Sequence, residues 1–126
     1  MIQQQTILKV LDNSGAKNVK CIKILGGYKK KIGKIGNLII VSVQNLRNKS
    51  KKTSKVKKGE VYNAIIIKTK TKSLNKDGSV FFFNHNAVSL LNKQKKPLAS
   101  RILSPVPKQF KRGKFSKIAS ISLGSI

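Results

Sequence analysis

Side chains that could carry acid–base, thiol or metal chemistry are scarce in this sequence. Its 126 residues include three carboxylates, one histidine and one cysteine: Asp12, Glu60, Asp77, His85 and Cys21. General acid–base catalysis relies on positioned carboxylates or imidazoles, and a closed structural zinc site takes four nitrogen or sulfur ligands. The sequence therefore predicts a protein that is not an enzyme and that carries no metal and no cofactor.

Basic side chains, in contrast, are abundant. The chain has 28 Lys and Arg residues against 3 Asp and Glu residues, which gives a formal net charge of +25. Such a charge repels itself unless a polyanion neutralises it, and nucleic acid and an anionic membrane surface are the two candidates. A membrane-binding protein would gather its basic residues on one face of a long amphipathic helix, whereas here they are spread through strand-like segments and polar turns. Nucleic acid is therefore the favoured partner.

The choice of Lys over Arg and the abundance of Asn and Ile give further information on the kind of contact and on the source of the protein. All but three basic residues are lysines, which bind phosphate as point charges, whereas arginine is the usual bidentate reader of guanine. Lys, Asn and Ile together fill 50 of the 126 positions, and AT-rich codons encode these residues. Met1–Thr6 has no targeting pattern, and apolar runs such as Ala64–Ile67 fall far short of the roughly 20 residues that span a bilayer. We therefore expect an organelle-encoded protein of the mitochondrion, with a plastid or a bacterial cytoplasm as alternatives.

The elements that must position the lysines are predominantly strands. Apolar and polar residues alternate in several segments, and turns rich in Gly, Asn and Asp separate these segments. Strands are predicted at residues 6–11, 18–25, 37–46, 60–72 and 79–91. The predicted fold is mainly β, a five-stranded small β-barrel that occupies residues 1–126 as one domain.

Two further segments are predicted outside the barrel strands. The lysine-rich stretch at about 46–59 is interpreted as a projecting basic β-hairpin arm, and residues from about 105 to 126 as a short helical C-terminal tail. In this tail, Pro107 is expected to start a short helix that ends at Gly113. Residues 115–120 fit either another helical turn or a final strand.

The predicted strand at 60–72 has two different faces. Lys68, Lys70 and Lys72 would lie about 6.6–6.8 Å apart along one face, and this row could follow a phosphate backbone or could simply be solvated. Ile65 and Ile67 alternate with these positions and are expected in the barrel core. The charge of the chain favours the first interpretation of the lysine row.

Other side chains are assigned mainly to the core. Phe81–Phe83 could stack nucleic-acid bases, but strand alternation favours the core, with Phe83 buried in the barrel beside Val41. Cys21, in an apolar strand, is expected to be a small core residue. His85 is expected at the surface or in a turn.

At this level of detail the chain resembles one family, the bacterial form of the universal large-ribosomal-subunit protein family number fourteen. The resemblance spans almost the whole chain in order. The stretches that carry it are Met1-Ile2-Gln3, Asp12-Asn13-Ser14-Gly15-Ala16, Cys21-Ile22-Lys23, Leu25-Gly26-Gly27, Val56-Lys57-Lys58-Gly59-Glu60-Val61, Ala64-Ile65-Ile66-Ile67, Asp77-Gly78-Ser79-Val80, Asn86-Ala87, Arg101-Ile102, Pro105-Val106 and Lys117-Ile118. The sequence departs from the family at Ser89, where a valine is usual, in a longer and more basic arm, and in the C-terminal residues 123–126.

The resemblance implies a barrel that binds large-subunit rRNA at the subunit interface and contributes to bridges with small-subunit rRNA. It also implies two neighbouring ribosomal proteins, those of families three and nineteen, and an exposed face that receives a silencing or anti-association factor. The residues expected to bind rRNA are Lys17, Lys20, Lys23, Lys29, Lys30, Lys31, Arg47, Lys49, Lys51, Lys52, Lys55, Lys57, Lys58, Lys68, Lys70, Lys72 and Lys76. The residues expected at the intersubunit or factor-binding face are Ser100, Arg101, Lys114 and Lys117.

The alternative from another functional class is a free OB-like protein that binds single-stranded nucleic acid or organises a nucleoid. A cationic membrane-active peptide is a more distant alternative. Co-sedimentation with the large ribosomal subunit separates the ribosomal interpretation from both.

Overall fold

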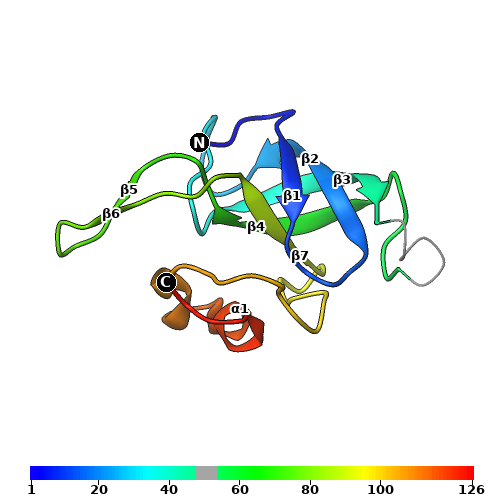
Figure 1. Ribbon diagram of the computed structural model, residues 1–126. Coiled ribbons are helices and arrows are strands. Elements are labelled where there is room, and N and C mark those ends of the chain that lie inside the picture. The colour runs from blue at the N-terminus through cyan, green and yellow to red at the C-terminus, as the bar shows by residue number, and fades with distance from the viewer. Residues whose placement is uncertain (48–53) are drawn as a thin grey trace.

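Five strands close into a barrel in the computed structural model of the chain, which describes residues 1–47 and 54–126 (Figure 1). The strands are β1 Ile7–Val10, β2 Ala16–Ile24, β3 Leu38–Leu46, β4 Val61–Lys68 and β7 Ala87–Leu91. Strands adjacent in the order β1-β2-β3-β4-β7 pair antiparallel, and the barrel closes where β7 pairs parallel with β1. The predicted mainly β fold with a five-stranded barrel is confirmed.

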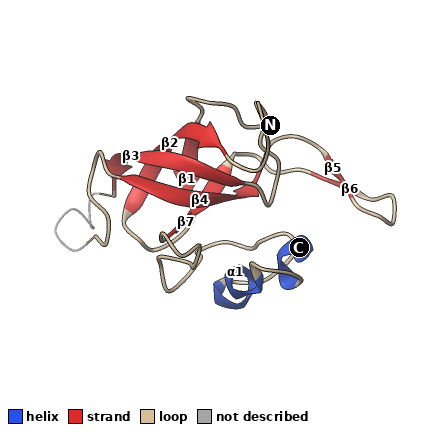
Figure 2. Cartoon of the chain, turned by 180° about the vertical axis from the view of Figure 1, so that it is seen from behind, coloured by secondary structure: helices blue, strands red, loops and turns tan. Residues whose placement is uncertain are grey.

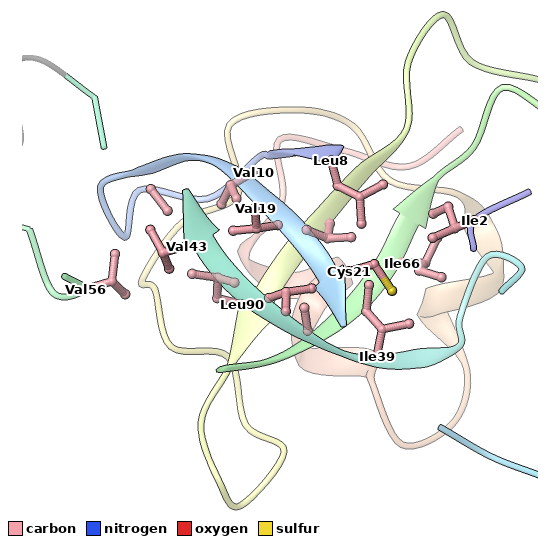
Figure 3. Packing of buried hydrophobic residues seen from close by; sticks show 14 of the residues in the cluster. Ile2, Leu8, Val10, Val19, Cys21, Ile39, Val43, Val56, Ile66 and Leu90 are labelled. Atoms are coloured by element: carbon pink, nitrogen blue, oxygen red, sulfur yellow. The ribbon is translucent and has the colours of Figure 1, made fainter. Parts of the chain in front are cut away.

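Aliphatic side chains from every barrel strand fill the interior. On β3, Ile39, Val41 and Val43 are at most 1% exposed and point inward, as the alternation predicts. Ile2 and Val56, both 0% exposed, lie at opposite ends of the row of core side chains (Figure 3). The barrel is therefore filled along its length and closed at each end by residues from outside its strands. The interior cluster consists of Ile2, Leu8, Val10, Ala16, Val19, Cys21, Ile24, Ile39, Val41, Val43, Val56, Ala64, Ile66, Val88 and Leu90.

One end of the barrel depends on a glycine. Ile2 and Gly33 exchange two backbone hydrogen bonds, with N···O distances of 3.1 and 2.7 Å. A Cβ atom on Gly33 would come within 2.7 Å of Cδ1 of Ile66, which is itself 0% exposed. A side chain at position 33 would therefore push the N-terminal residue or the core apart.

Strand β4 is buried on both sides. Ala64 and Ile66 point into the barrel, whereas Ile65 and Ile67 belong to a second apolar cluster outside it. The sequence-based expectation that Ile65 and Ile67 are buried is confirmed, but their place inside the barrel is wrong. The outward side chains of β4 and β7 are called the covered face below. The second cluster consists of Leu11, Ile65, Ile67, Ala87, Leu91, Ile102, Val106, Phe110 and Ile118.

The C-terminal tail provides this cover. It contains a 3-10 helix, η2 Lys108–Lys111, and a short α-helix, α1 Ser116–Ile121, which lie against one side of the barrel in both views (Figures 1 and 2). Pro107 immediately precedes the first helix, as predicted, and Gly113 follows it with φ +95°. The predicted helix is therefore observed, but it ends at Lys111, because Arg112 is already extended. Of the two alternatives for residues 115–120, the helix is the one observed.

Between β4 and β7 the chain leaves the barrel. Strands β5 Ser73–Leu74 and β6 Val80–Phe81 form a two-stranded hairpin that projects from the barrel (Figure 1). The predicted continuous strands 60–72 and 79–91 are therefore wrong in extent, because the first ends at Lys68 and the second begins at Ala87. A register shift between Ile66 and Lys68 accompanies the departure, and the alternating Lys and Thr residues that follow offer no apolar face to bury.

Phe83 lies outside the barrel as a result. Its ring packs edge to face with Phe81, with ring centroids 5.9 Å apart, and it is half-buried. Neither phenylalanine belongs to either buried cluster, and Phe82 is 60% exposed. The prediction that Phe83 fills the barrel is wrong, because the hairpin carries this segment away before β7 begins.

Candidate nucleic-acid interface

The outward side chains of β1 and β2 form a basic surface that the tail does not cover. Lys9 on β1 and Lys17 and Lys23 on β2 are exposed, and Lys20 is half-buried. Strand pairing places Ile7 opposite Lys20 and Lys9 opposite Asn18, which fixes these side chains on one side of the sheet. The outward side chains of β1 and β2 are called the open face below; they are Ile7, Lys9, Lys17, Asn18, Lys20, Ile22 and Lys23.

Irregular pairing sets the spacing of the lysines on β2. Register shifts between β2 and β3 fall between Ala16 and Val19 and between Cys21 and Lys23. A residue inserted at a bulge shifts the alternation of inward and outward side chains by one position. As a result Val19, Cys21 and Ile24 point into the barrel. The lysines three residues apart therefore share the outside of one strand, an arrangement that strict alternation would not give.

All three carboxylates of the chain are bound in local structure. Asp12 is 0% exposed and accepts hydrogen bonds from Ser14 N and Leu90 N, at 3.2 and 2.8 Å, and from the hydroxyls of Ser14 and Ser89. Its carboxylate ties the turn after β1 to strand β7. The bonds that Asp12 accepts come from its own turn and from β7, not from the lysines of the open face.

The other two carboxylates fix turns. Glu60 accepts hydrogen bonds from Tyr62 OH and from Lys57 N at 3.0 Å, and these bonds lower the pKa of Glu60. Burial and the bond to Glu60 raise the pKa of Tyr62 to about 12. Asp77 accepts from Ser79 N and Oγ, at 3.0 and 2.7 Å, which lowers its pKa and closes the tip of the β5–β6 hairpin. Three carboxylates cannot balance 28 basic side chains, so most of the positive charge is left for a partner outside the chain.

Three predicted rRNA-binding lysines lie in the loop after β2. Lys29 and Lys31 are exposed, and Lys30 is half-buried against the Gly26–Gly27 turn. Together with Lys23, they line a surface depression of about 680 Å³. The loop therefore continues the basic surface of β2 beyond the end of the strand.

The foot of the predicted arm is fixed to the barrel. The Arg47 guanidinium donates to Val10 O at 3.2 Å, and Lys55 N donates to Ser14 O at 3.1 Å. Lys55, Lys57 and Lys58 are exposed on either side of the buried Val56. Lys49, Lys51 and Lys52 lie outside the described residues, so the hairpin form of the arm and their rRNA contacts stay predictions.

The proposed lysine row on β4 is wrong in geometry. Lys68 is 7% exposed, and its ammonium lies over the Phe83 ring, 5.1 Å from the centroid. Burial lowers the pKa of this ammonium. Lys70 and Lys72 are exposed but follow the end of the strand, and Lys76 is exposed at the hairpin tip. The three lysines therefore do not share one strand face.

The residues predicted for the intersubunit face fall into two groups. Asn13 anchors the exposed Ser100 and Arg101, because its Nδ2 donates to Ser100 Oγ at 2.9 Å and its Oδ1 accepts from Arg101 N at 3.2 Å. Lys114 and Lys117 line a different depression, of about 390 Å³. A bridge between Ile102 and Ser122 joins the Ser100–Arg101 segment to the end of α1, so the first group is connected to the tail that carries Lys114 and Lys117.

Some residues of these surfaces were not predicted from the sequence. Lys9 lines a depression of about 360 Å³ with Lys17 and Arg47, and Lys95 and Lys96 share the depression of Lys114 and Lys117. Isolated lysines in a lysine-rich chain carry no local signal, and only the strand pairing and the loop positions bring them to these surfaces.

Cys21 is buried and unpaired, as expected, and burial raises the pKa of its thiol. His85 is half-buried in the bend before β7. Its pKa is lowered by burial and by the charges of Lys9, Lys68 and Lys70. Within residues 1–47 and 54–126, no three His, Cys, Asp or Glu side chains are grouped as metal ligands would be. None of the helices in the same residues has the length and apolarity to span a membrane.

Comparison with known protein families gives a match over nearly the whole chain. Residues 1–125 match the family model described as ribosomal protein L14p/L23e. The matched region includes every strand of the barrel, the projecting hairpin and both helices of the tail.

Proposed function

Because the chain belongs to the ribosomal protein L14p/L23e family, and so has a structural role in the large ribosomal subunit, we propose that it binds large-subunit rRNA through its open face and adjacent loops. The observation that carries this proposal is the contrast between 28 basic residues and three carboxylates, all three of which are bound in local structure. Lysines on the open face displace counterions from phosphates, and the barrel holds them in fixed positions.

The rRNA-contacting set comprises the lysines of β2 and of the loop after β2, the basic residues of the predicted arm at about 46–59, and Lys68, Lys70, Lys72 and Lys76. Lys68 is its weakest member, because its ammonium is buried against Phe83. Ser100, Arg101, Lys114 and Lys117 form the intersubunit or factor-binding face, supported by their exposure and by the bridge that joins their two segments. The neighbours on the subunit are the proteins of families three and nineteen, and residues 1–126 act as one domain.

The composition supports an organelle-encoded protein of the mitochondrial ribosome. Lys, Asn and Ile fill 50 of the 126 positions, as an AT-rich genome would produce. A plastid or a bacterial ribosome remains the alternative. Mass spectrometry of purified mitochondrial large subunits would contradict the assignment if intact particles lacked this chain.

A salt titration tests the proposed open face. We expect the slope of log K against log salt concentration for a large-subunit rRNA fragment to fall by about 0.9 for each lost phosphate contact. The test variant is Lys17→Gln, Lys20→Gln and Lys23→Gln together. The matched control is Lys108→Gln, Lys111→Gln and Arg112→Gln, which removes the same charge from exposed positions in and next to η2.

The two triple variants distinguish a specific face from general charge attraction. If the β2 variant reduces the slope and the control does not, rRNA lies on the open face. Equal reductions in both would contradict the proposal and favour a free protein that binds nucleic acid by net charge alone.

A further inference from the structure

The loop after β2 places an aromatic ring where a nucleic-acid base could reach it. Tyr28 is 91% exposed, although burial of a tyrosine ring away from water is energetically favourable. The Lys29 ammonium lies over this ring, 5.4 Å from its centroid. The lysine approaches one side of the ring, and the exposure of Tyr28 shows that the other side is open.

The backbone holds this arrangement in a tight reversal. Gly26 has φ +99° and Lys29 has φ +49°, so the chain turns sharply on each side of Tyr28. The Lys30 side chain crosses the glycines, and a Cβ on Gly27 would lie 3.8 Å from Lys30 Cβ and Cδ. Tyr28 is therefore carried at the tip of a turn that is packed by its own neighbour.

The surroundings of the ring suit a single nucleotide. The depression beside Tyr28 has a volume of about 680 Å³, and Lys23, Lys30, Lys31, Gln3 and Gln4 are among the residues that line it. The carboxylates of the chain are bound elsewhere, in the turns of Asp12, Glu60 and Asp77. The site thus combines a stacking surface, cations for phosphate, and amides that can donate to and accept from a base edge.

We propose that Tyr28 stacks on an unpaired base of RNA, while Lys29, Lys30 and Lys31 bind the phosphates that flank this base. This inference rests on the proposed function, because it names the kind of rRNA structure that this part of the surface recognises. A base within a regular duplex is stacked on its neighbours and is not available to the ring. The site therefore selects a bulge, a loop or a single-stranded end.

Two probes with equal numbers of phosphates test the proposal on the full chain. One is a single-stranded RNA oligonucleotide and the other is a blunt RNA duplex. The variants are Tyr28→Ala, the ring-preserving Tyr28→Phe, and Lys29→Gln with Lys30→Gln and Lys31→Gln. Tyr28 and Tyr62 are the two tyrosines, and the sequence has no tryptophan, so fluorescence quenching that the Tyr28→Ala variant lacks reports directly on Tyr28.

We expect Tyr28→Ala to weaken binding of the single strand roughly tenfold, within the range known for base–aromatic stacking. Tyr28→Phe retains the affinity, and duplex binding is unchanged in both variants. The triple lysine variant weakens binding of both probes and lowers the salt slope by about 0.7 per contact for the single strand.

The outcomes separate this inference from the function on which it rests. If the parent chain binds both probes and Tyr28→Ala changes neither affinity, or changes both equally, base stacking on Tyr28 is overturned while rRNA binding stands. If the parent chain binds neither probe, the proposed function itself fails.

Discussion

The two outer faces of the barrel differ in what covers them. On the covered face, Ile65 and Ile67 are 0% exposed beneath tail residues such as Phe110 and Ile118. On the open face, Lys17 and Lys23 stay exposed, and no segment within residues 1–47 and 54–126 packs a comparable apolar cluster against them. The same small barrel thus uses one outer face for its own stability and leaves the other for a partner.

The difference reflects the side chains that each face presents. Full burial of an aliphatic or aromatic side chain contributes about 1.5–3 kcal/mol to the stability of the fold. A tail that covers the isoleucines of β4 is therefore stabilising. Burial of an unpaired lysine is unfavourable, so packing an apolar segment over the lysines of β2 would destabilise the fold. A polyanion, in contrast, gains from the lysines because it supplies the missing charge.

The largest expected effect is on the covered face. Phe110 is 4% exposed within the outer cluster, and Phe110→Ala is expected to lower the free energy of unfolding by about 3–5 kcal/mol. Urea denaturation measures this loss. Lys23→Ala on the open face is the control and is expected to stay within about 0.5 kcal/mol of the parent. Equal stability of the Phe110 variant and the parent would show that the tail is not part of the folded unit.

The second prediction concerns the seam where the barrel closes. Asp12→Asn replaces one carboxylate oxygen by a donor, which leaves Leu90 N or Ser14 N without an acceptor. An unsatisfied buried donor costs about 1–3 kcal/mol, and the urea midpoint is expected to fall accordingly. Asp77→Asn, in an exposed turn, is the matched control and is expected to change the midpoint little. Similar losses in the two variants would mean that the buried position of Asp12 has no special importance.

The third prediction concerns the hairpin base, between the two faces. Phe83→Ala removes an edge-to-face contact with Phe81 and the Lys68 ammonium above its ring. These interactions contribute roughly 0.5–1.5 and 0.5–1 kcal/mol, so the total loss is expected to stay below that of Phe110→Ala. Thermal unfolding of both variants decides the order. A larger loss of stability in Phe83→Ala than in Phe110→Ala would show that Phe83 is a core residue.

The smallest expected effect is the pH dependence of stability that His85 causes, because this side chain lies near the positive charges beside the open face. The folded-state pKa of His85 lies below 6.5, because of burial and the charges of Lys9, Lys68 and Lys70. The folded state therefore binds fewer protons than the unfolded state, and stability falls as the pH drops from 6.5 through the lowered folded pKa. The pKa values of Glu60 and Asp77 are lowered from 4.5 and 3.8 by their hydrogen bonds, so these two carboxylates titrate below this window.

Melting temperatures between about pH 7.5 and about pH 5.5 measure this effect. The parent is expected to lose stability over this range, and His85→Gln is expected to lose less. Lys9→Gln should raise the pKa of His85 in an NMR titration, since it removes one of the neighbouring charges. An unchanged pKa in that variant would show that burial alone causes the shift.

The sequence by itself determined the charge and the mainly β character of the chain, but not the extent of every strand. Alternation on β3 placed Val41 and Val43 correctly, because every second side chain of a strand shares a face. Net charge and the scarcity of carboxylates indicated a nucleic-acid partner, since both are properties of composition that do not depend on the fold. Pro107 and Gly113 marked a short helix, since their backbone preferences act locally.

Only the tertiary structure decided which face is open and where each lysine lies. The tail residues that cover β4, such as Val106 and Phe110, are too scattered to form a periodic pattern, and their contacts join residues distant in sequence. Bulges in β2 bring Lys17, Lys20 and Lys23 to one side, and the departure of the hairpin removes Phe83 from the core. These features depend on pairing between strands and on packing between segments, which no local pattern encodes.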